Sequence, residues 1–319
     1  MLITSGSRRY LAAAILIPGY WAIAQPQTVE NPPDFIVQGR RMIQEGKPDE
    51  ALALYRIILK SQPESVAAND AAGTVLDLMG KGLEAREHFQ KVIDLARDPK
   101  GKAAAQRAMA MSWAFAGDCA ETVKYEQMVI GYYASQKDFF QQGEIADEAA
   151  RVCLDNGQFD TAYQWYFTGH DLGLKQPDIT PDRKSLWEFR WEHAQARIAA
   201  RKGNQTEADK HVAAAKALLV KDPEMAKGQA AFLPYLVGYV AFYRGDYETA
   251  LAQLEKANQN DAFIQCLMAE TYENLGQADK AKEFYQKAAA VASHNPPAAY
   301  ARPRAMKKLA PKAEKPAGN

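Results

Sequence analysis

The chain has 319 residues, which is enough for one long domain or two ordinary ones. Its 39 basic residues are balanced by 39 acidic residues. A dedicated nucleic-acid-binding domain usually has an excess of basic residues, so this class of protein is excluded and we expect no nucleic-acid partner. Apolar residues make up 47% and aromatic residues 10%, which excludes wholesale disorder. Alanine is abundant and proline lies mostly at segment boundaries, so the composition favours an all-α protein.

The first 24 residues have the pattern of an export signal. Arg8 and Arg9 precede an apolar run at residues 10–23, and the Ala-Ile-Ala motif at residues 22–24 suits a signal peptidase. The run is shorter than the roughly 20 apolar residues that a membrane-spanning helix needs. We therefore predict cleavage after Ala24 and an exported mature chain, periplasmic or secreted, without a transmembrane helix. Retention of the run as a membrane anchor is the alternative.

After a linker at residues 25–31, one phrase recurs along residues 32–292: a glycine, followed five residues later in most copies by alanine. The glycines are Gly46, Gly80, Gly117, Gly157, Gly203, Gly245 and Gly276. Helical periodicity flanks each phrase, so each glycine is expected to end one helix in the left-handed conformation before a second helix begins. This recurrence predicts a series of stacked helical hairpins.

The pattern resembles the tetratricopeptide repeat, a helix–turn–helix unit of 34 residues. In the first unit the matching positions are Gly39, Met42, Gly46, Ala51, Tyr55, Ile58 and Pro63, and in the last they are Tyr272, Gly276, Ala281, Tyr285 and Ala288. Two units depart from the pattern, because Thr122 replaces the turn alanine and Val212 replaces the later aromatic residue. The resemblance implies an all-α fold, a right-handed α–α superhelix of about seven such units with a concave groove.

Two segments depart from the repeat spacing. Residues 173–184 contain Pro177 and Pro181 and predict a loop, with Thr180 capping a long helix that runs to about Lys202. Residues 293–319 are basic and rich in proline, alanine and lysine. We expect a short helix over residues 298–309, then a partly disordered, soluble extension, with contact to an acidic polymer or anionic lipid as the alternative.

In the family that the sequence resembles, the first helix of each unit lines the groove. The predicted partner-binding positions are then Arg190, His193, Arg197, Arg201, Tyr235, Tyr239 and Tyr243. A cationic stripe beside an aromatic one suits an extended peptide, because guanidinium groups bind carboxylates and tyrosine rings stack and donate hydrogen bonds; it also suits a glycan. In the alternative, the tyrosines fill the seam to the last unit and the arginines pair with Glu144, Asp147 or Glu148.

Three cysteines, Cys119, Cys153 and Cys266, do not form the pattern of a disulfide framework. A bridge between the first two, 34 residues apart, is open, but small buried apolar side chains are the simpler interpretation.

Motifs for catalysis are missing from the sequence. There is no GxSxG, HExxH, P-loop or dinucleotide-binding glycine motif, and the five histidines lack metal-ligand spacing. We therefore expect no catalytic residue, metal or cofactor. The sequence predicts a non-catalytic exported scaffold that binds a protein or peptide in its groove, with a component that binds cell-envelope polysaccharide as the alternative.

The turn alanines are expected where the two helices of a unit approach most closely. Ala250→Leu should therefore overpack this contact and lower the free energy of unfolding by about 1–3 kcal/mol. Thermal unfolding of the variant and the parent measures the effect. Equal melting temperatures would show that Ala250 does not lie at a close contact.

Overall fold

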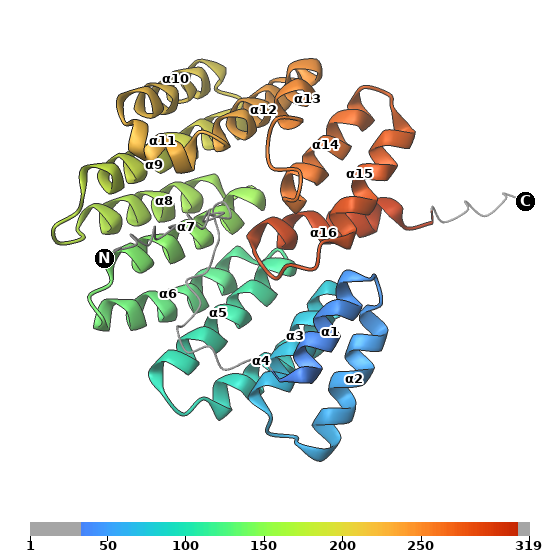
Figure 1. The fold of residues 1–319 in the computed structure, drawn as a ribbon. Coiled ribbons are helices and arrows are strands. Elements are labelled where there is room, and N and C mark those ends of the chain that lie inside the picture. The colour runs from blue at the N-terminus through green and yellow to red at the C-terminus, as the bar shows by residue number, and fades with distance from the viewer. Residues whose placement is uncertain (1–32, 312–319) are drawn as a thin grey trace, which may run out of the picture. The chain divides into compact units, whose positions relative to one another are not determined.

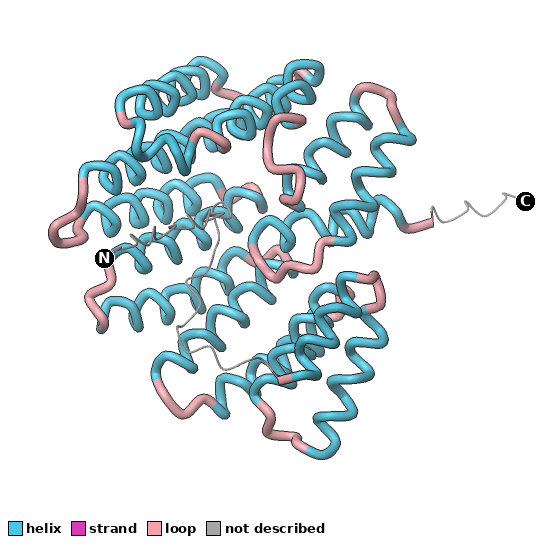
Figure 2. The backbone as a smooth tube through the Cα atoms, in the orientation of Figure 1, coloured by secondary structure: helices cyan, strands magenta, loops and turns pink. Residues whose placement is uncertain are grey.

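A computed structural model describes residues 33–311, in which sixteen α-helices and no strand are found (Figure 2). The expected export signal, the linker and the end of the basic tail, including Lys312 and Lys315, lie outside the described residues. The described part is an all-α superhelical stack of hairpins, as the sequence predicts (Figure 1).

Seven hairpins account for fourteen of the helices. The first four are α1 (Asp34–Gln44) with α2 (Pro48–Ser61), α3 (Val66–Leu78) with α4 (Gly82–Leu95), α5 (Pro99–Phe115) with α6 (Cys119–Ser135), and α7 (Phe139–Asp155) with α8 (Phe159–Leu174). The last three are α9 (Pro181–Arg201) with α10 (Gln205–Lys221), α12 (Phe232–Arg244) with α13 (Tyr247–Leu254), and α14 (Ala262–Asn274) with α15 (Ala278–Ala290). The short α11 (Pro223–Gln229) and the C-terminal α16 (Pro296–Leu309) are additional.

The seven glycines of the recurring phrase each lie between the two helices of a hairpin. All seven have positive φ angles, between 73° and 85°. In the first hairpin the Gly46 amide donates to the Ile43 carbonyl at 3.0 Å, and the Lys47 amide donates to the Met42 carbonyl at 2.8 Å. These two bonds satisfy carbonyls that the end of α1 would otherwise leave free. The predicted turns are therefore confirmed.

The alanines of the phrase are buried where the helices of a hairpin meet. Ala51, Ala85 and Ala250, for example, have no exposed surface. Thr122, which replaces alanine in the third hairpin, is equally buried, and its hydroxyl donates to the Asp118 carbonyl at 2.7 Å. The hydroxyl is therefore satisfied within its own helix, which explains why this position accepts a polar residue.

The long helix predicted after the loop is present as α9, beginning at Pro181 and ending at Arg201. Thr180 occupies the N-cap position, but its side chain makes no capping hydrogen bond, contrary to expectation. The short helix α11 was not expected from the repeat pattern. Its first turn is capped by the Asp222 carboxylate, which accepts from the Met225 amide at 3.0 Å.

The C-terminal helix α16 packs against four other helices, namely α5, α7, α14 and α15 (Figure 1). Its residues from Pro296 to Ala301 are buried, and so is Ala305. The structure thus places residues 296–309 inside the hairpin stack, whereas the sequence analysis assigned them to an extension separate from it. The expected helix over residues 298–309 coincides with α16.

Gly173 and Trp187 provide a test of the packing between α8 and α9. The Trp187 side chain is fully buried, and a Cβ atom at Gly173 would overlap its indole ring. We expect Gly173→Ala to lower the free energy of unfolding by about 3 kcal/mol or more, because a buried ring cannot move aside. Urea denaturation measures the change.

Gly131→Ala is the matched control, because Gly131 lies within α6 and a Cβ atom there meets nothing within 4 Å. This variant should be about 0.5–1 kcal/mol more stable than the parent, since alanine favours the helix. Equal effects of the two substitutions would contradict the observed packing of Trp187.

Candidate functional site

The first helices of the hairpins form a surface that we call the first-helix face, and the predicted aromatic stripe lies on it in α12. Tyr235 and Tyr239 are buried, with ring centroids 5.9 and 6.0 Å from that of Phe263 in α14. Tyr243 is half-buried beside Tyr239, at a centroid distance of 4.7 Å. The tyrosines therefore fill the seam between α12 and α14, which is the alternative that the sequence analysis left open.

The predicted cationic stripe in α9 is likewise engaged within the protein. Arg190 forms an ion pair with Glu144 of α7. Arg197, which is 5% exposed, donates to the Tyr166 hydroxyl at 2.8 Å. Arg201 is half-buried, with its guanidinium group 5.0 Å from the ring centroid of Tyr243.

The structure thus brings both stripes together on adjoining helices but does not expose them as expected. That expectation is wrong for four residues, which are buried: His193, Arg197, Tyr235 and Tyr239. The helices stack so closely that the side chains of one first helix contact those of the next. The spacing of residues within a single helix does not reveal such contacts between helices. Binding of a partner by the seven residues remains a prediction.

Carboxylates are buried beneath the same face. Burial raises the pKa of Asp147 in α7 to about 7, although Arg190 acts in the opposite direction. Glu126 in α6 is fully buried, neither of its carboxylate oxygens has a hydrogen-bond partner among the described residues, and burial together with Glu148 raises its pKa well above the usual value. Glu148 itself accepts from the Arg107 Nε at 2.9 Å. Glu148 is thus paired, whereas burial without a partner favours the protonated form of Glu126.

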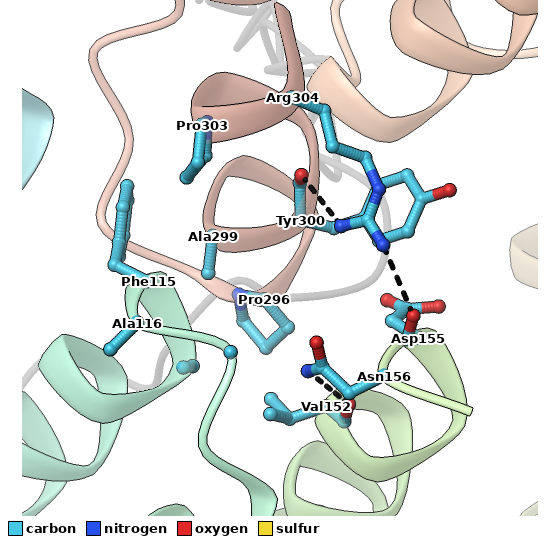
Figure 3. Close-up of a pocket in the computed structure, with 12 residues that line it drawn as sticks. Phe115, Ala116, Val152, Asp155, Asn156, Pro296, Ala299, Tyr300, Pro303 and Arg304 are labelled. Atoms are coloured by element: carbon cyan, nitrogen blue, oxygen red, sulfur yellow. Dashed lines mark hydrogen bonds between the residues drawn. The ribbon is translucent and has the colours of Figure 1, made fainter. Parts of the chain in front are cut away.

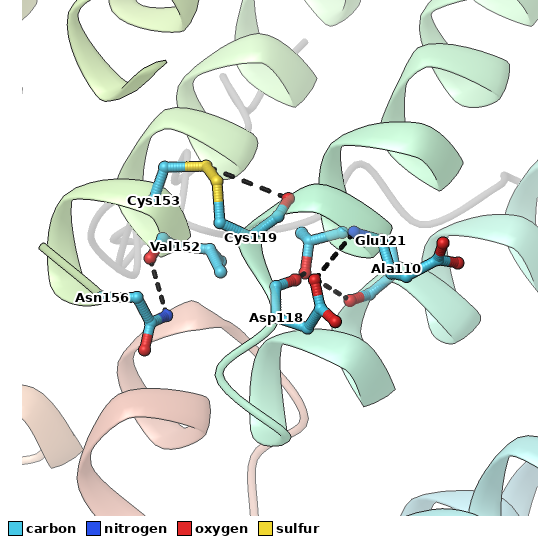
Figure 4. Close-up of a disulfide and its surroundings, with 8 residues drawn as sticks. Ala110, Asp118, Cys119, Glu121, Val152, Cys153 and Asn156 are labelled. Carbon is cyan, nitrogen blue, oxygen red and sulfur yellow. Dashed lines mark hydrogen bonds between the residues drawn. A yellow bond between two sulfur atoms is a disulfide. The ribbon is translucent and has the colours of Figure 1, made fainter. Parts of the chain in front are cut away.

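A disulfide joins Cys119 at the start of α6 to Cys153 in α7, with the Cα atoms 4.9 Å apart (Figure 4). The interpretation of these two cysteines as free apolar side chains is therefore wrong. It holds for Cys266, which is free and buried. The bridge connects the third hairpin to the fourth and closes a loop of 34 residues, which restricts the unfolded chain and contributes about 2–4 kcal/mol.

An exposed aromatic cluster lies on α8 and α9, and the sequence analysis did not single it out as a site. Tyr163 and Phe167 of α8 are 38% and 49% exposed, and their ring centroids lie 5.3 and 5.9 Å from that of Trp191 in α9. His170 stacks on the same indole at 5.5 Å and lies 3.3 Å from a Glu188 carboxylate oxygen. We call Tyr163, Phe167, His170 and Trp191 the aromatic cluster. Its sequence signal is the spacing of Tyr163 and Phe167, which places both rings on one side of a second helix.

A pocket of about 220 Å³ lies where α5, α7 and α16 meet (Figure 3). Phe115 and Asn156 line it from the ends of α5 and α7, and Ala299, Tyr300 and Arg304 line it from α16. The pocket is small and is bounded by the C-terminal helix, so it belongs to the contact between α16 and the first-helix face.

Within residues 33–311 no group of three His, Cys, Asp or Glu side chains is placed to hold a metal ion. None of the helices in that range is long and apolar enough to cross a membrane.

One sequence-family model matches a part of the chain. Residues 264–295 match the tetratricopeptide repeat, and this match spans most of α14 and all of α15. No curated protein matches the chain.

Solved structures that resemble the chain contain similar repeats. The tetratricopeptide-like repeats of a putative kinesin light chain from Podosopora anserina are 19% identical, with a TM-score of 0.48, and cover 59% of this chain and 94% of theirs. A tetratricopeptide repeat protein from Parabacteroides merdae is 13% identical, with a TM-score of 0.46, covering 86% of this chain and 98% of its own. At these identities and TM-scores, neither likeness carries an inference about function.

Asp147 should make stability depend on pH. Its pKa of about 7 in the folded protein lies above the unfolded value of 3.8, so its stabilising contribution is complete below pH 4 and is lost as the pH rises through 7. Asp147→Asn removes this ionisation, so relative to the parent the variant should gain about 2–3 kcal/mol between pH 5 and pH 8. Urea denaturation at both pH values measures the gain. Equal pH dependence in the two proteins would contradict the raised pKa.

Proposed function

We propose that this tetratricopeptide-repeat protein is a non-catalytic, exported scaffold that binds a protein partner, and that the aromatic cluster on α8 and α9 is part of its binding surface. The observation that carries the proposal is the exposure of Tyr163 and Phe167 in a fold whose other large aromatic side chains are mostly buried or half-buried. Aromatic residues are enriched in protein interfaces and supply much of their binding energy.

The cluster has the properties of a binding surface. Both exposed rings contact the Trp191 indole edge to face, which restricts them already, so little side-chain freedom is lost when a partner covers them. His170 and Glu188 add polar groups at the edge. Apolar patches rimmed by polar groups are typical of protein interaction sites.

The seven residues of the predicted groove are divided by their exposure between contact with a partner and support of the fold. Arg190, Arg201 and Tyr243 are half-buried and are the members of the two stripes that a partner could reach. The other four, being buried, are expected to hold α9 and α12 in place.

Export is supported by two independent features. Disulfides persist in oxidising compartments such as the bacterial periplasm and the extracellular space, and Cys119 and Cys153 form one. The N-terminal residues have the pattern of a cleavable signal. Both features support the proposal that the mature protein works in the periplasm or outside the cell.

Capture experiments test the proposal. Immobilised mature chain is incubated with envelope extract, beside the double variant Tyr163→Ser/Phe167→Ser. One protein should be retained by the parent, with at least about a tenfold lower affinity for the variant, because central aromatic residues contribute about 2 kcal/mol each. The affinity is then measured by titration with the purified partner.

The control is Leu83→Ser/Val220→Ser, which changes two side chains that are 78% and 76% exposed and lie on other helices. It should bind as the parent does. Equal binding by all three proteins would show that the aromatic cluster is not part of the binding surface. Retention of envelope polysaccharide instead of protein would favour the alternative, since exposed aromatic rings also stack on sugars, and retention of neither would overturn the proposal.

A further inference from the structure

Two glutamates of α9 lie beside the aromatic cluster. Glu188 comes three residues before Trp191 and Glu192 directly follows it, and their side chains are 37% and 22% exposed. Residues three and four apart in a helix lie on the same side, so both carboxylates share the side of α9 that carries Trp191. The aromatic cluster therefore continues into an acidic surface, and we call Glu188 and Glu192 the glutamate pair.

The charged partners of the glutamate pair are histidines. A carboxylate oxygen of Glu188 lies 3.3 Å from Nε2 of His170, and one of Glu192 lies 2.6 Å from Nδ1 of His211. Within residues 33–311 neither carboxylate forms a salt bridge with a lysine or an arginine, although Lys184 lies one turn before Glu188. An imidazole is charged only when it is protonated, whereas lysine and arginine are charged throughout the neutral range. The glutamate pair therefore lacks a permanent counter-charge.

The acidic residues on the neighbouring helices differ from the glutamate pair in this respect. The helices α8 and α10 both pack against α9. Every aspartate and glutamate in α8 and α10 forms a salt bridge with a lysine or arginine: Asp160 with Lys202, Asp171 with Lys175, Glu207 with Lys210 and Asp209 with Arg244. The negative charge of this region that has no such partner is thus concentrated next to Trp191.

Arg190 shows how this protein accommodates a guanidinium group beside an aromatic ring. The group lies 4.7 Å from the ring centroid of Trp187 and forms an ion pair with Glu144. The ring face and the carboxylate both attract the same cation. The aromatic cluster and the glutamate pair present these two kinds of group at the surface, where a cation from outside the chain can reach them.

Arginine suits such a surface better than other side chains. Its planar guanidinium group stacks on aromatic rings and donates two parallel hydrogen bonds to a carboxylate. Tyr163 and Phe167 are one helical turn apart in α8, so their exposed rings supply two neighbouring positions for stacking. An acidic segment would be repelled by the glutamate pair, and a neutral segment would leave its charge uncompensated.

We propose that the aromatic cluster and the glutamate pair form one surface that binds a basic segment of a protein partner, whose arginine side chains stack on Tyr163 and Phe167 and pair with Glu188 and Glu192. The inference rests on the proposed function, that the aromatic cluster binds a protein, and names the chemistry of that partner. It assigns to the glutamate pair the selection of basic over neutral or acidic segments.

The test uses the full mature chain and a fluorescent peptide in which arginine alternates with serine. The comparison peptide has citrulline in place of arginine, which keeps the size and planarity of the side chain and removes its charge. We expect the arginine peptide to bind at least about tenfold more tightly in anisotropy titrations, because the cation contacts both a ring and a carboxylate. Equal affinities of the two peptides, or no binding of the arginine peptide, would overturn the inference.

The variant Glu188→Gln/Glu192→Gln locates the binding of the arginine peptide. It should bind the arginine peptide at least about fivefold more weakly than the parent, because each lost carboxylate removes an ion pair. The matched control is Glu87→Gln/Glu248→Gln, which removes the same charge from exposed positions in α4 and α13 and should bind as the parent does. Equal losses in the two double variants would show a general effect of net charge and would overturn the inference. Circular dichroism checks that both variants are folded.

The same variants separate this inference from the proposed function. In the capture experiment, loss of the partner by Tyr163→Ser/Phe167→Ser with full retention by Glu188→Gln/Glu192→Gln would leave the aromatic cluster as a protein-binding surface and overturn the basic partner. Loss by both double variants would support the inference. Retention by both would overturn the proposed function together with the inference.

Discussion

Each hairpin of this protein depends on a backbone residue with positive φ between its two helices. Seven glycines supply this conformation, and the bonds from their amides and from the following residues close the end of the first helix. The second helix then returns against the first, close enough to bury an alanine such as Ala51 completely. Because one hairpin cannot bury its apolar surface alone, the repetition of this turn produces the stack.

Close stacking also explains the chemistry of the first-helix face. Side chains that would line an open surface in a looser stack are instead confined between neighbouring first helices. The rings of Tyr235 and Tyr239 can be accommodated there, but the charges of Arg197 and Asp147 require partners or protonation. The buried polar network is thus a consequence of close packing. It fixes the register of neighbouring helices, and it does not by itself indicate a ligand site.

Local features of this fold could be predicted from the sequence, and distant pairings could not. The turn glycines, the buried alanines and the limits of α9 follow from residues within one turn of each other. The disulfide, the burial of Tyr239 and the docking of α16 depend on contacts between different hairpins. His294 and Asp77 are 217 residues apart, and no periodic pattern in the sequence predicts that they form a pair. The aromatic cluster had a local signal, but it lies on a second helix, outside the stripe that the resemblance indicated.

The aromatic cluster and the first-helix face differ in what each can offer to a partner. Tyr163 and Phe167 are exposed and contact Trp191, so a partner could cover both rings without any rearrangement of the fold. Tyr235 and Tyr239 on the first-helix face are buried against Phe263. The close packing that stabilises the stack therefore removes most of the aromatic surface of the first helices from contact with a partner, and leaves the rings on α8 accessible.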